Sequence, residues 1–280
     1  MNVGFSKKML CTNCGAVIHG KYCSNCGQKK FDKNELTIVH FFEDTLHSFT
    51  HFDAKIFKAI QYLFTKPGFL TKEFSKGKIN TYIKPITLFI LLNAFLFFFI
   101  HVIFPFKDSD YNFYMKKYPR TEKIFNAYQQ THNLTHSELE EKFNATLEFY
   151  KKMEYFIIIP LFGAGLYLIF VGRKKFYIEY LVQAIHTFSW YVLTIIVLIP
   201  LAVIVAELLH LHNKYFDTAL TSILFIVCFI YNYFSIKRIF SVKSIIAVIY
   251  TLLVTSLMIY LDTFFSGWLI FQLTSLHFIF

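Results

Sequence analysis

The stretch that decides the fold is YLVQAIHTFSWYVLTIIVLIPLAVIVA at residues 180–206, in which no residue carries a formal charge. An α-helix rises about 1.5 Å per residue, so about 20 apolar residues cross the hydrocarbon layer of a membrane. Four other stretches have a similar composition. The five predicted spans are 85–104, 155–172, 180–206, 218–236 and 243–261. We therefore predict an all-α polytopic membrane protein with about five transmembrane helices.

The composition of the whole chain supports this class. Hydrophobic residues make up 55% of the 280 residues and aromatic residues 20%, whereas only 16% are charged. A soluble domain of this size could not bury so much apolar surface in its core. The excess apolar surface therefore predicts contact with lipid.

Lys and Arg cluster in three of the short segments that flank the predicted spans, and short loops rich in these residues stay on the cytosolic side of a membrane. This rule predicts a cytosolic N-terminus and an external C-terminus. The long segment 105–154 mixes both charges, and its apolar periodicity predicts an external helical hairpin. The basic residues are Lys66, Lys72, Lys76, Lys78 and Lys84, then Arg173, Lys174 and Lys175, then Lys237, Arg238 and Lys243.

A last apolar stretch, 263–280, contains Ser266-Gly267, a dipeptide that predicts a helix break. The part that follows is short for a crossing. We therefore expect the membrane domain to end at residue 266, within 85–266, and residues 267–280 to form an interfacial or re-entrant apolar tail. A sixth span is the alternative.

Two matching cysteine motifs stand near the N-terminus, Cys11-Thr12-Asn13-Cys14-Gly15 and Cys23-Ser24-Asn25-Cys26-Gly27. Each CxxC places two thiolates around one metal ion, and two such motifs supply the tetrahedral sulfur set that Zn²⁺ prefers. The alternatives are a rubredoxin-like iron site and a redox-active cysteine pair. We predict a cytosolic zinc ribbon at 1–30 with Cys11, Cys14, Cys23 and Cys26 as ligands of a structural Zn²⁺.

Between the ribbon and the first span, the segment 34–84 reads as an amphipathic helix followed by a basic juxtamembrane stretch. At 100° per residue, apolar side chains gather on one face of this helix. Such a helix suits the cytosolic interface of a membrane that contains anionic lipids. The residues expected at the interface are Phe42, Phe49, Ile56, Lys66, Lys72 and Lys78.

The opposite face carries His40, Asp44, His47 and His51. Histidines four residues apart on a helix can share a metal ion, and imidazole also changes its charge near neutral pH. The first and last histidines lie about 16 Å apart along the axis, so one ion could not bind the whole row. We interpret the stripe as a hydrated face that points toward the lipid headgroups, with a second metal site or a pH-sensing site as the alternatives.

A set of short motifs follows in order along the first third of the chain. The motifs are the two cysteine motifs with Gln28, His47-Ser48-Phe49-x-His51-Phe52-Asp53, Thr65-Lys66-Pro67-Gly68, Lys76-Gly77-Lys78 and Pro85. Their order resembles the bacterial membrane family known as domain of unknown function 3667. The resemblance covers about residues 11–92, and Ile79 stands where the family tends to carry an arginine. It implies a zinc ribbon fused to a multispan domain of the bacterial inner membrane.

The sequence contains no GxSxG, HExxH or Gly-rich phosphate loop and no paired aspartates in adjacent spans, so we do not expect an enzyme. The net charge of +10 comes mainly from residues that flank the spans, so we do not expect nucleic-acid binding. The polar residues within the spans are expected to form hydrogen bonds between helices. They are Asn93, His101, Gln183, His186, Asn232 and Asp262.

These observations favour a membrane-anchored interaction, scaffold or regulatory protein. The ribbon would bind a cytosolic protein partner, and the basic segments would contact anionic lipid headgroups. A small-solute or lipid transporter is the alternative, because Pro160 and Pro200 can break spans at a substrate site. Sequence alone leaves the oligomeric state open.

Overall fold

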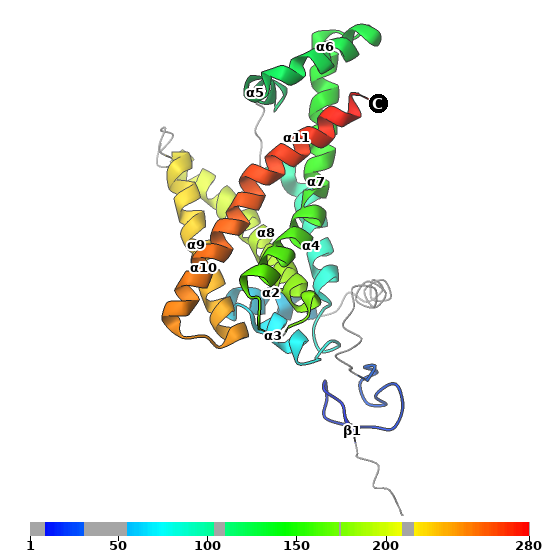
Figure 1. Cartoon of the computed structure of the whole chain (residues 1–280), viewed down its shortest axis with the longest axis vertical. Coiled ribbons are helices and arrows are strands. Elements are labelled where there is room, and N and C mark those ends of the chain that lie inside the picture. Colours follow the sequence, from blue (N-terminus) through cyan, green and yellow to red (C-terminus); the bar gives the residue numbers. More distant parts are fainter. Residues whose placement is uncertain (1–8, 31–54, 104–109, 174, 209–215, 280) are drawn as a thin grey trace, which may run out of the picture.

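A computed structural model describes residues 9–30, 55–103, 110–173, 175–208 and 216–279. The chain forms a small N-terminal ribbon and a helical membrane domain (Figure 1). The elements are β1 (Met9–Leu10), β2 (Val17–Ile18), α2 (Lys55–Thr65), α3 (Phe69–Ser75), α4 (Pro85–Ile103), α5 (Asp110–Lys117), η2 (Pro119–Thr121), α6 (Glu122–Thr131), α7 (His136–Ile169), α8 (Tyr177–Leu208), α9 (Phe216–Phe240), α10 (Ser244–Ile259), η3 (Tyr260–Phe265) and α11 (Ser266–His277).

Helix α8 lies at the centre of the bundle. Every residue from Tyr180 to Val192 is buried, on all sides of the helix. A helix that is apolar and buried all round must be surrounded by other helices. The helices α2, α3, α4, α7 and α9 all pack against it, so the stretch that first indicated a membrane protein also forms the core of its helical domain.

The structure confirms the all-α class and places helices at the predicted spans. Within the described residues, three helical segments are long and apolar enough to cross a membrane, namely Tyr177–Ala206, Thr218–Phe240 and Ser244–His277. A fourth is a pair bent by 40°, His136–Lys151 with Met153–Ile169, which coincides with α7. The first predicted span coincides with α4, a helix of 19 residues without a charged side chain.

The predicted helix break at Ser266-Gly267 is wrong. The chain continues from α10 through the π-helical turn η3 into α11, so Ser244–His277 is one helical segment rather than a span with a re-entrant or interfacial tail. The Ser266 hydroxyl donates a hydrogen bond to the Asp262 carbonyl within the helix. A glycine inside a helix costs only about 1 kcal/mol, and the packing of α11 against α7 offsets this cost.

In the segment between the first two predicted spans, the described residues from Asp110 onward are mainly helical. The segment contains α5, η2, α6 and the beginning of α7, where Thr135 and Glu138 form a capping box. Together with α11 these elements enclose a second core, separate from that of the bundle, which we call the cap core. Its buried members are Tyr111, Tyr114, Phe125, Leu139, Phe143, Leu147, Ile270, Phe271 and Phe278.

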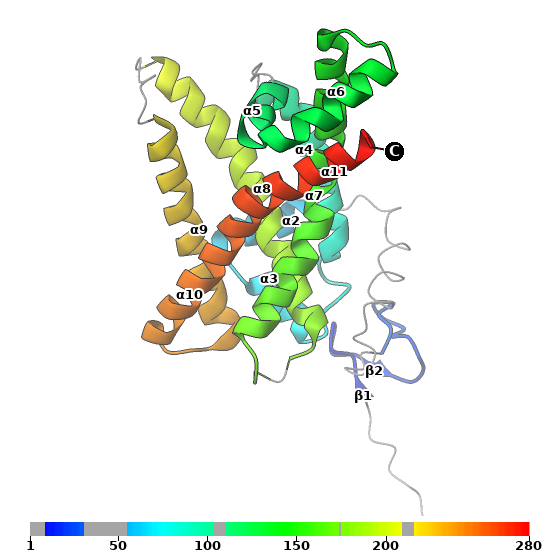
Figure 2. The same ribbon diagram turned by 45° about the horizontal axis from the view of Figure 1, so that its top comes forward.

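The C-terminus is therefore attached to the cap. The ring of Phe278 lies 5.3 Å from that of Phe125 and 4.8 Å from that of Tyr128, measured between centroids. Figures 1 and 2 show α5, α6 and the C-terminus at one end of the molecule and the ribbon at the other. The C-terminal end of α11 therefore lies at the same end of the molecule as the segment 110–150.

Candidate metal centre and its docking on the membrane domain

The ribbon consists of two knuckles with the same backbone hydrogen bonds. In the first, the amide of Cys11 donates to the Ala16 carbonyl at 2.8 Å, and that of Gly15 donates to the Cys11 carbonyl at 2.9 Å. In the second, Cys23 and Gly27 donate in the same way to Gln28 and Cys23, both at 2.9 Å. Gly15 and Gly27 have φ values of 77° and 69°, a left-handed conformation that strongly favours glycine.

This repeated geometry brings the four predicted ligands together. The sulfur atoms of Cys11, Cys14, Cys23 and Cys26 all lie within 4.8 Å of one another. The Cys11–Cys26 and Cys14–Cys23 sulfur pairs are separated by 3.7 and 3.5 Å. A tetrahedral Zn²⁺ with four thiolates at about 2.3 Å requires sulfur–sulfur distances of about 3.8 Å. The four cysteines therefore fit a four-coordinate metal ion.

The two cysteines of the first knuckle differ in environment. A backbone hydrogen bond from Ala16 lowers the pKa of the exposed Cys14 thiol to about 6, whereas burial raises that of Cys11 to about 11. A coordinated metal cation deprotonates its thiol ligands, so the buried Cys11 depends more on the ion for its thiolate form than Cys14 does. Four thiolates fill a tetrahedral shell, and such a site folds a module rather than activating water.

The ribbon docks on the loop between α3 and α4 through Gln28, whose side chain is 3% exposed. Its Nε2 donates to the Gly77 carbonyl at 2.7 Å and to the Thr12 hydroxyl at 3.0 Å. Its Oε1 accepts from the amides of Ile79 and Asn80, each at 3.3 Å. One carboxamide therefore contacts both the first knuckle and three positions of the loop, Gly77, Ile79 and Asn80.

Two further hydrogen bonds join the same surfaces. The Thr12 hydroxyl donates to the Gly77 carbonyl at 3.0 Å, and the Thr81 hydroxyl donates to the side-chain oxygen of Asn13. Gln28 and Lys76-Gly77-Lys78 belong to the motifs on which the family resemblance rested. The structure brings these two motifs, far apart in the sequence, into direct contact.

Glu73 holds the other side of this loop. Its side chain is 6% exposed and forms ion pairs with Lys76 at 2.7 Å and Lys78 at 2.6 Å. Burial works against the ionised form of Glu73, but the hydrogen bonds from the two lysines outweigh it and lower the pKa of the carboxyl below its ordinary value. Lys78, predicted to lie at the membrane interface, is therefore paired within the protein.

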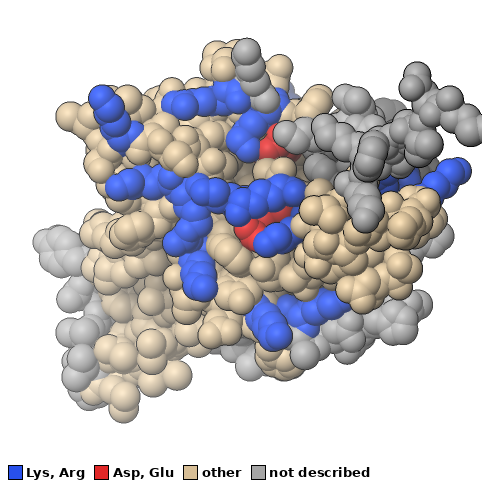
Figure 3. All heavy atoms as spheres, turned by 90° about the horizontal axis from the view of Figure 1, so that it is seen from below, with Lys and Arg blue, Asp and Glu red and all other residues tan. Residues whose placement is uncertain are grey.

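The three basic segments meet at the ribbon end of the bundle, as the sequence predicted. The guanidinium of Arg238 donates to the Pro67 carbonyl, and the ammonium of Lys175 donates to the Ser75 hydroxyl at 3.5 Å. Figure 3 shows Lys and Arg side chains gathered across this face, with few acidic groups among them. Of the other interface residues, Lys72 is partly buried on α3 and the exposed Lys66 lies over the rings of Tyr62 and Phe69.

The predicted amphipathic helix is described only from Lys55 onward, as α2. In this described part, the predicted apolar face packs on the bundle, because Leu63 is buried in the bundle core and Ile60 packs against that core. Ile56 is half-buried, and the exposed apolar side chains of α2 are Phe57 and Phe64. The other predicted residues, Phe42, Phe49 and the stripe of His40, Asp44, His47 and His51, lie outside the described residues.

The turn Lys66-Pro67-Gly68 explains why α2 packs on the bundle. Gly68 has a φ of 75°, and a Cβ at this position would lie 2.8–2.9 Å from backbone and side-chain atoms of Ser235 on α9. Only glycine lets the turn approach α9 so closely. A Pro-Gly pair in the sequence indicates a turn, but it does not indicate that α9 is the partner.

Three of the six polar residues noted within the predicted spans, His186, Asn232 and Asp262, form hydrogen bonds between helices. The Thr71 hydroxyl lies 2.9 Å from Nδ1 of His186, which joins α3 to α8, and the Asn232 amide donates to the Thr255 hydroxyl at 3.1 Å. Asp262 accepts hydrogen bonds from the hydroxyls of Tyr155 at 3.2 Å and Tyr191 at 2.6 Å. These contacts connect α7, α8, α9 and the C-terminal helix.

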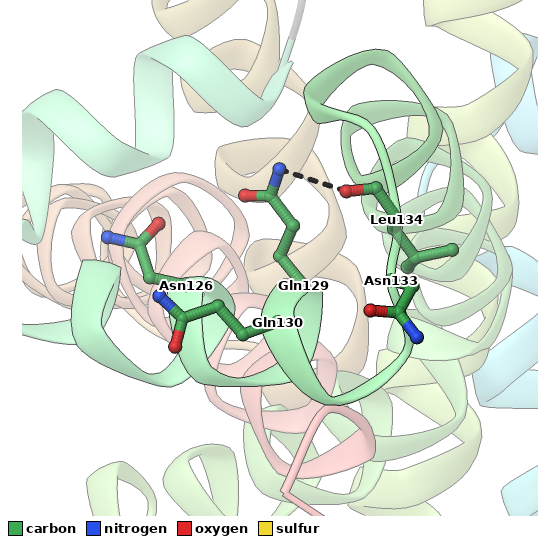
Figure 4. Close-up of a pocket in the computed structure, with 5 residues that line it drawn as sticks. All are labelled: Asn126, Gln129, Gln130, Asn133 and Leu134. Carbon is green, nitrogen blue, oxygen red and sulfur yellow. Dashed lines mark hydrogen bonds between the residues drawn. The ribbon is translucent and has the colours of Figure 1, made fainter.

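A hollow of about 490 Å³ lies on the cap, at the turn between α6 and α7 (Figure 4). Carboxamides dominate its lining, and the Gln129 amide donates to the Leu134 carbonyl at 3.1 Å. Uncharged amides supply neither a general acid or base nor a set of metal ligands. The five lining residues are Asn126, Gln129, Gln130, Asn133 and Leu134.

Comparison with known families supports the resemblance over part of the chain. A family model described as "Protein of unknown function (DUF3667)" matches residues 53–98. This range includes α2, α3, the loop that holds the ribbon and most of α4. No curated protein and no solved structure matches the chain. The protein thus contains a segment similar to this family, joined to a cysteine cluster suited to a metal ion and to helices suited to a membrane.

Proposed function

We propose that this protein is a membrane-anchored zinc-ribbon protein that serves as an interaction, scaffold or regulatory module of the bacterial inner membrane. One observation carries the proposal. Four cysteine sulfurs converge within 4.8 Å in a small module that is hydrogen-bonded to the basic end of a multi-helix membrane domain.

The chemistry of the ligand set favours zinc in a structural role. Four thiolates form the soft tetrahedral shell that Zn²⁺ occupies in ribbons and fingers. The two strands of the ribbon are only two residues long each, so the polypeptide alone buries little apolar surface there. The metal ion therefore supplies most of the free energy that folds the ribbon.

The distribution of charge supports a cytosolic ribbon. The ribbon docks at the end where the Lys- and Arg-rich loops meet, and such loops stay in the cytosol. Thiolates also remain reduced in that compartment. With the ribbon inside, the cap and the C-terminus face outward, because they lie at the opposite end of the bundle (Figure 1).

The exposed surface of the ribbon suits a protein partner. The exposed fraction is 60% for Leu10, 62% for Tyr22 and 44% for Met9. Exposed apolar and aromatic side chains on a small rigid module are typical of protein interfaces. The basic face beside the ribbon is suited to anionic lipid headgroups.

The transporter alternative has less support. Carriers place polar groups where a substrate can reach them. Here His186, Asn232 and Asp262 are hydrogen-bonded to side chains on neighbouring helices. Pro160 lies inside the helical part Met153–Ile169 of α7, and Pro200 lies inside α8. The three polar residues thus act as contacts between helices.

Crosslinking in native membranes tests the scaffold function. We expect a cytosolic protein to be captured by the wild-type protein and lost from Cys14→Ser, because that variant cannot hold the metal and fold the ribbon. Cys228→Ser is the matched control, since Cys228 lies buried in the bundle away from the ribbon. Capture that is equal in all three proteins would contradict the proposal, as would solute flux in vesicles that depends on the spans alone.

A further inference from the structure

We infer that metal binding to the ribbon controls the loop between α3 and α4, with Gln28 as the latch. The loaded ribbon holds the loop, and loss of the metal releases it. This inference rests on the metal-binding ribbon of the proposed function and adds a conformational consequence to it. The loop leads directly into α4, which begins at Pro85.

The position of Gln28 links the metal to the loop. Gln28 follows the last cysteine by two residues, and its carbonyl closes the second knuckle by accepting from the Cys23 amide at 2.9 Å. Its side chain points the other way and contacts Gly77, Ile79 and Asn80. A knuckle that loses its shape on metal removal therefore withdraws the side chain from the loop.

The loop divides into an anchored and a releasable part. Lys76 and Lys78 remain paired with Glu73, and the Lys78 amide donates to the Glu73 carbonyl at 3.1 Å. These contacts do not involve the ribbon. The amides of Ile79 and Asn80, in contrast, donate to Gln28 itself. Metal loss should thus free the amides of Ile79 and Asn80 and leave residues 76–78 attached to α3, while Tyr82 stays packed against Tyr62 and Phe69.

The repeated sequence of the ribbon provides a precise test variant. The first knuckle reads CTNCGA at 11–16 and the second reads CSNCGQ at 23–28. Ala16 closes its knuckle with the same backbone hydrogen bond that Gln28 makes. Gln28→Ala therefore gives the second knuckle the ending of the first and should keep its metal-binding geometry while it removes the latch.

The experiment uses the full-length protein in detergent or nanodiscs and measures zinc content together with amide hydrogen exchange of residues 76–84. We expect exchange at Ile79 and Asn80 to rise about tenfold in Gln28→Ala and in chelator-treated wild type. Gln28→Ala should still carry one zinc per chain. Ser24→Ala is the matched control, because Ser24 is exposed and takes the place in the second knuckle that Thr12 has in the first.

The outcomes separate the latch from the metal site. Gln28→Ala with full zinc content and unchanged exchange would overturn the latch and leave the zinc ribbon intact. Wild-type protein without any bound metal would overturn the proposed zinc ribbon, and the inference with it. If Gln28→Ala fails to fold, Thr81→Ala provides a second test, because it removes the contact to Asn13 from the loop side and leaves both knuckles unchanged. Faster exchange in zinc-loaded Thr81→Ala supports the docking, and unchanged exchange contradicts it.

Discussion

The side chain of Gln28 donates a hydrogen bond of 2.7 Å to the carbonyl of Gly77, although 49 positions separate the two residues in the chain. This contact joins a ribbon that is folded around a metal site to a membrane domain that is folded around an apolar helix. Each part owes its stability to a different kind of interaction, and the loop at Gly77 is where the two parts meet.

The purified protein should contain about one zinc ion per chain. Replacing Cys23 by Ser should remove the metal and unfold the ribbon, because metal binding and ribbon folding form one equilibrium. The helices should remain inserted in the membrane. Elemental analysis and circular dichroism of the membrane-extracted protein check this result. Iron in place of zinc, or a folded and reduced protein without metal, would contradict the assignment.

Reporter fusions should show that the two ends of the bundle lie on opposite sides of the membrane. A reporter after Gln28 or at Arg173 should read cytosolic, because these sites lie at the basic end. One near Asn133 or at the C-terminus should read external, because Phe278 packs against Phe125 in the cap core. Agreement between the reporters at Asn133 and Arg173 would show that α7 does not cross.

Gly68→Ala should destabilise the protein more than Gly172→Ala does. Both glycines have positive φ, at 75° and 89°, so both variants carry a backbone cost of about 1–2 kcal/mol. Only at Gly68 does the added Cβ also meet Ser235, whereas Gly172 has open space around it. Overpacking of this kind adds about 1–3 kcal/mol. Thermal unfolding in detergent measures the difference, and equal stabilities would refute the close approach of the turn to α9.

Phe278→Ala should loosen the cap without affecting the bundle. Phe278 is 5% exposed among aromatic side chains, and removing a buried phenyl ring costs about 3–5 kcal/mol. Ile279→Ala is the matched control, because Ile279 is 53% exposed and should change stability by no more than about 0.5 kcal/mol. Limited proteolysis of the segment 110–150 reports the effect. A cap that resists proteolysis equally in both variants would mean that the C-terminus does not stabilise it.

Acidification should weaken the loop that holds the ribbon. The pKa of Glu73 is lowered in the folded protein, so its ionised carboxylate stabilises the loop at pH values above the ordinary pKa of a glutamate. This contribution is lost as the pH falls through the lowered pKa. The lysine partners are partly exposed, which limits the effect to about 1 kcal/mol. Protection of the loop amides between about pH 6 and about pH 3 measures it. Glu73→Gln should show weaker protection that no longer depends on this titration, and an unchanged pH profile in that variant would exclude Glu73 as the cause.

The sequence by itself determined the four sulfur ligands, the apolar helices and the side on which the basic loops gather. Each depends on local information. Within each six-residue knuckle, the CxxCG spacing fixes the relative positions of two sulfur atoms. An uncharged stretch of about 20 residues must form a helix in lipid, because its backbone groups have no other hydrogen-bond partners there. The capping of α7 by Thr135 and Glu138 is local in the same sense.

Only the tertiary structure decided the continuity of the C-terminal helix, the burial of α2 and the docking of the ribbon. At Ser266-Gly267 a weak local preference for a break was outweighed by the packing of α11 against α7 and the cap. The apolar face of α2 is compatible with contact to lipid and with contact to protein. The turn at Gly68, which lies against Ser235 of α9, places this helix on the bundle. Gln28 carries no local signal for its partner, because its hydrogen bonds depend on backbone groups that the fold brings close from distant parts of the chain.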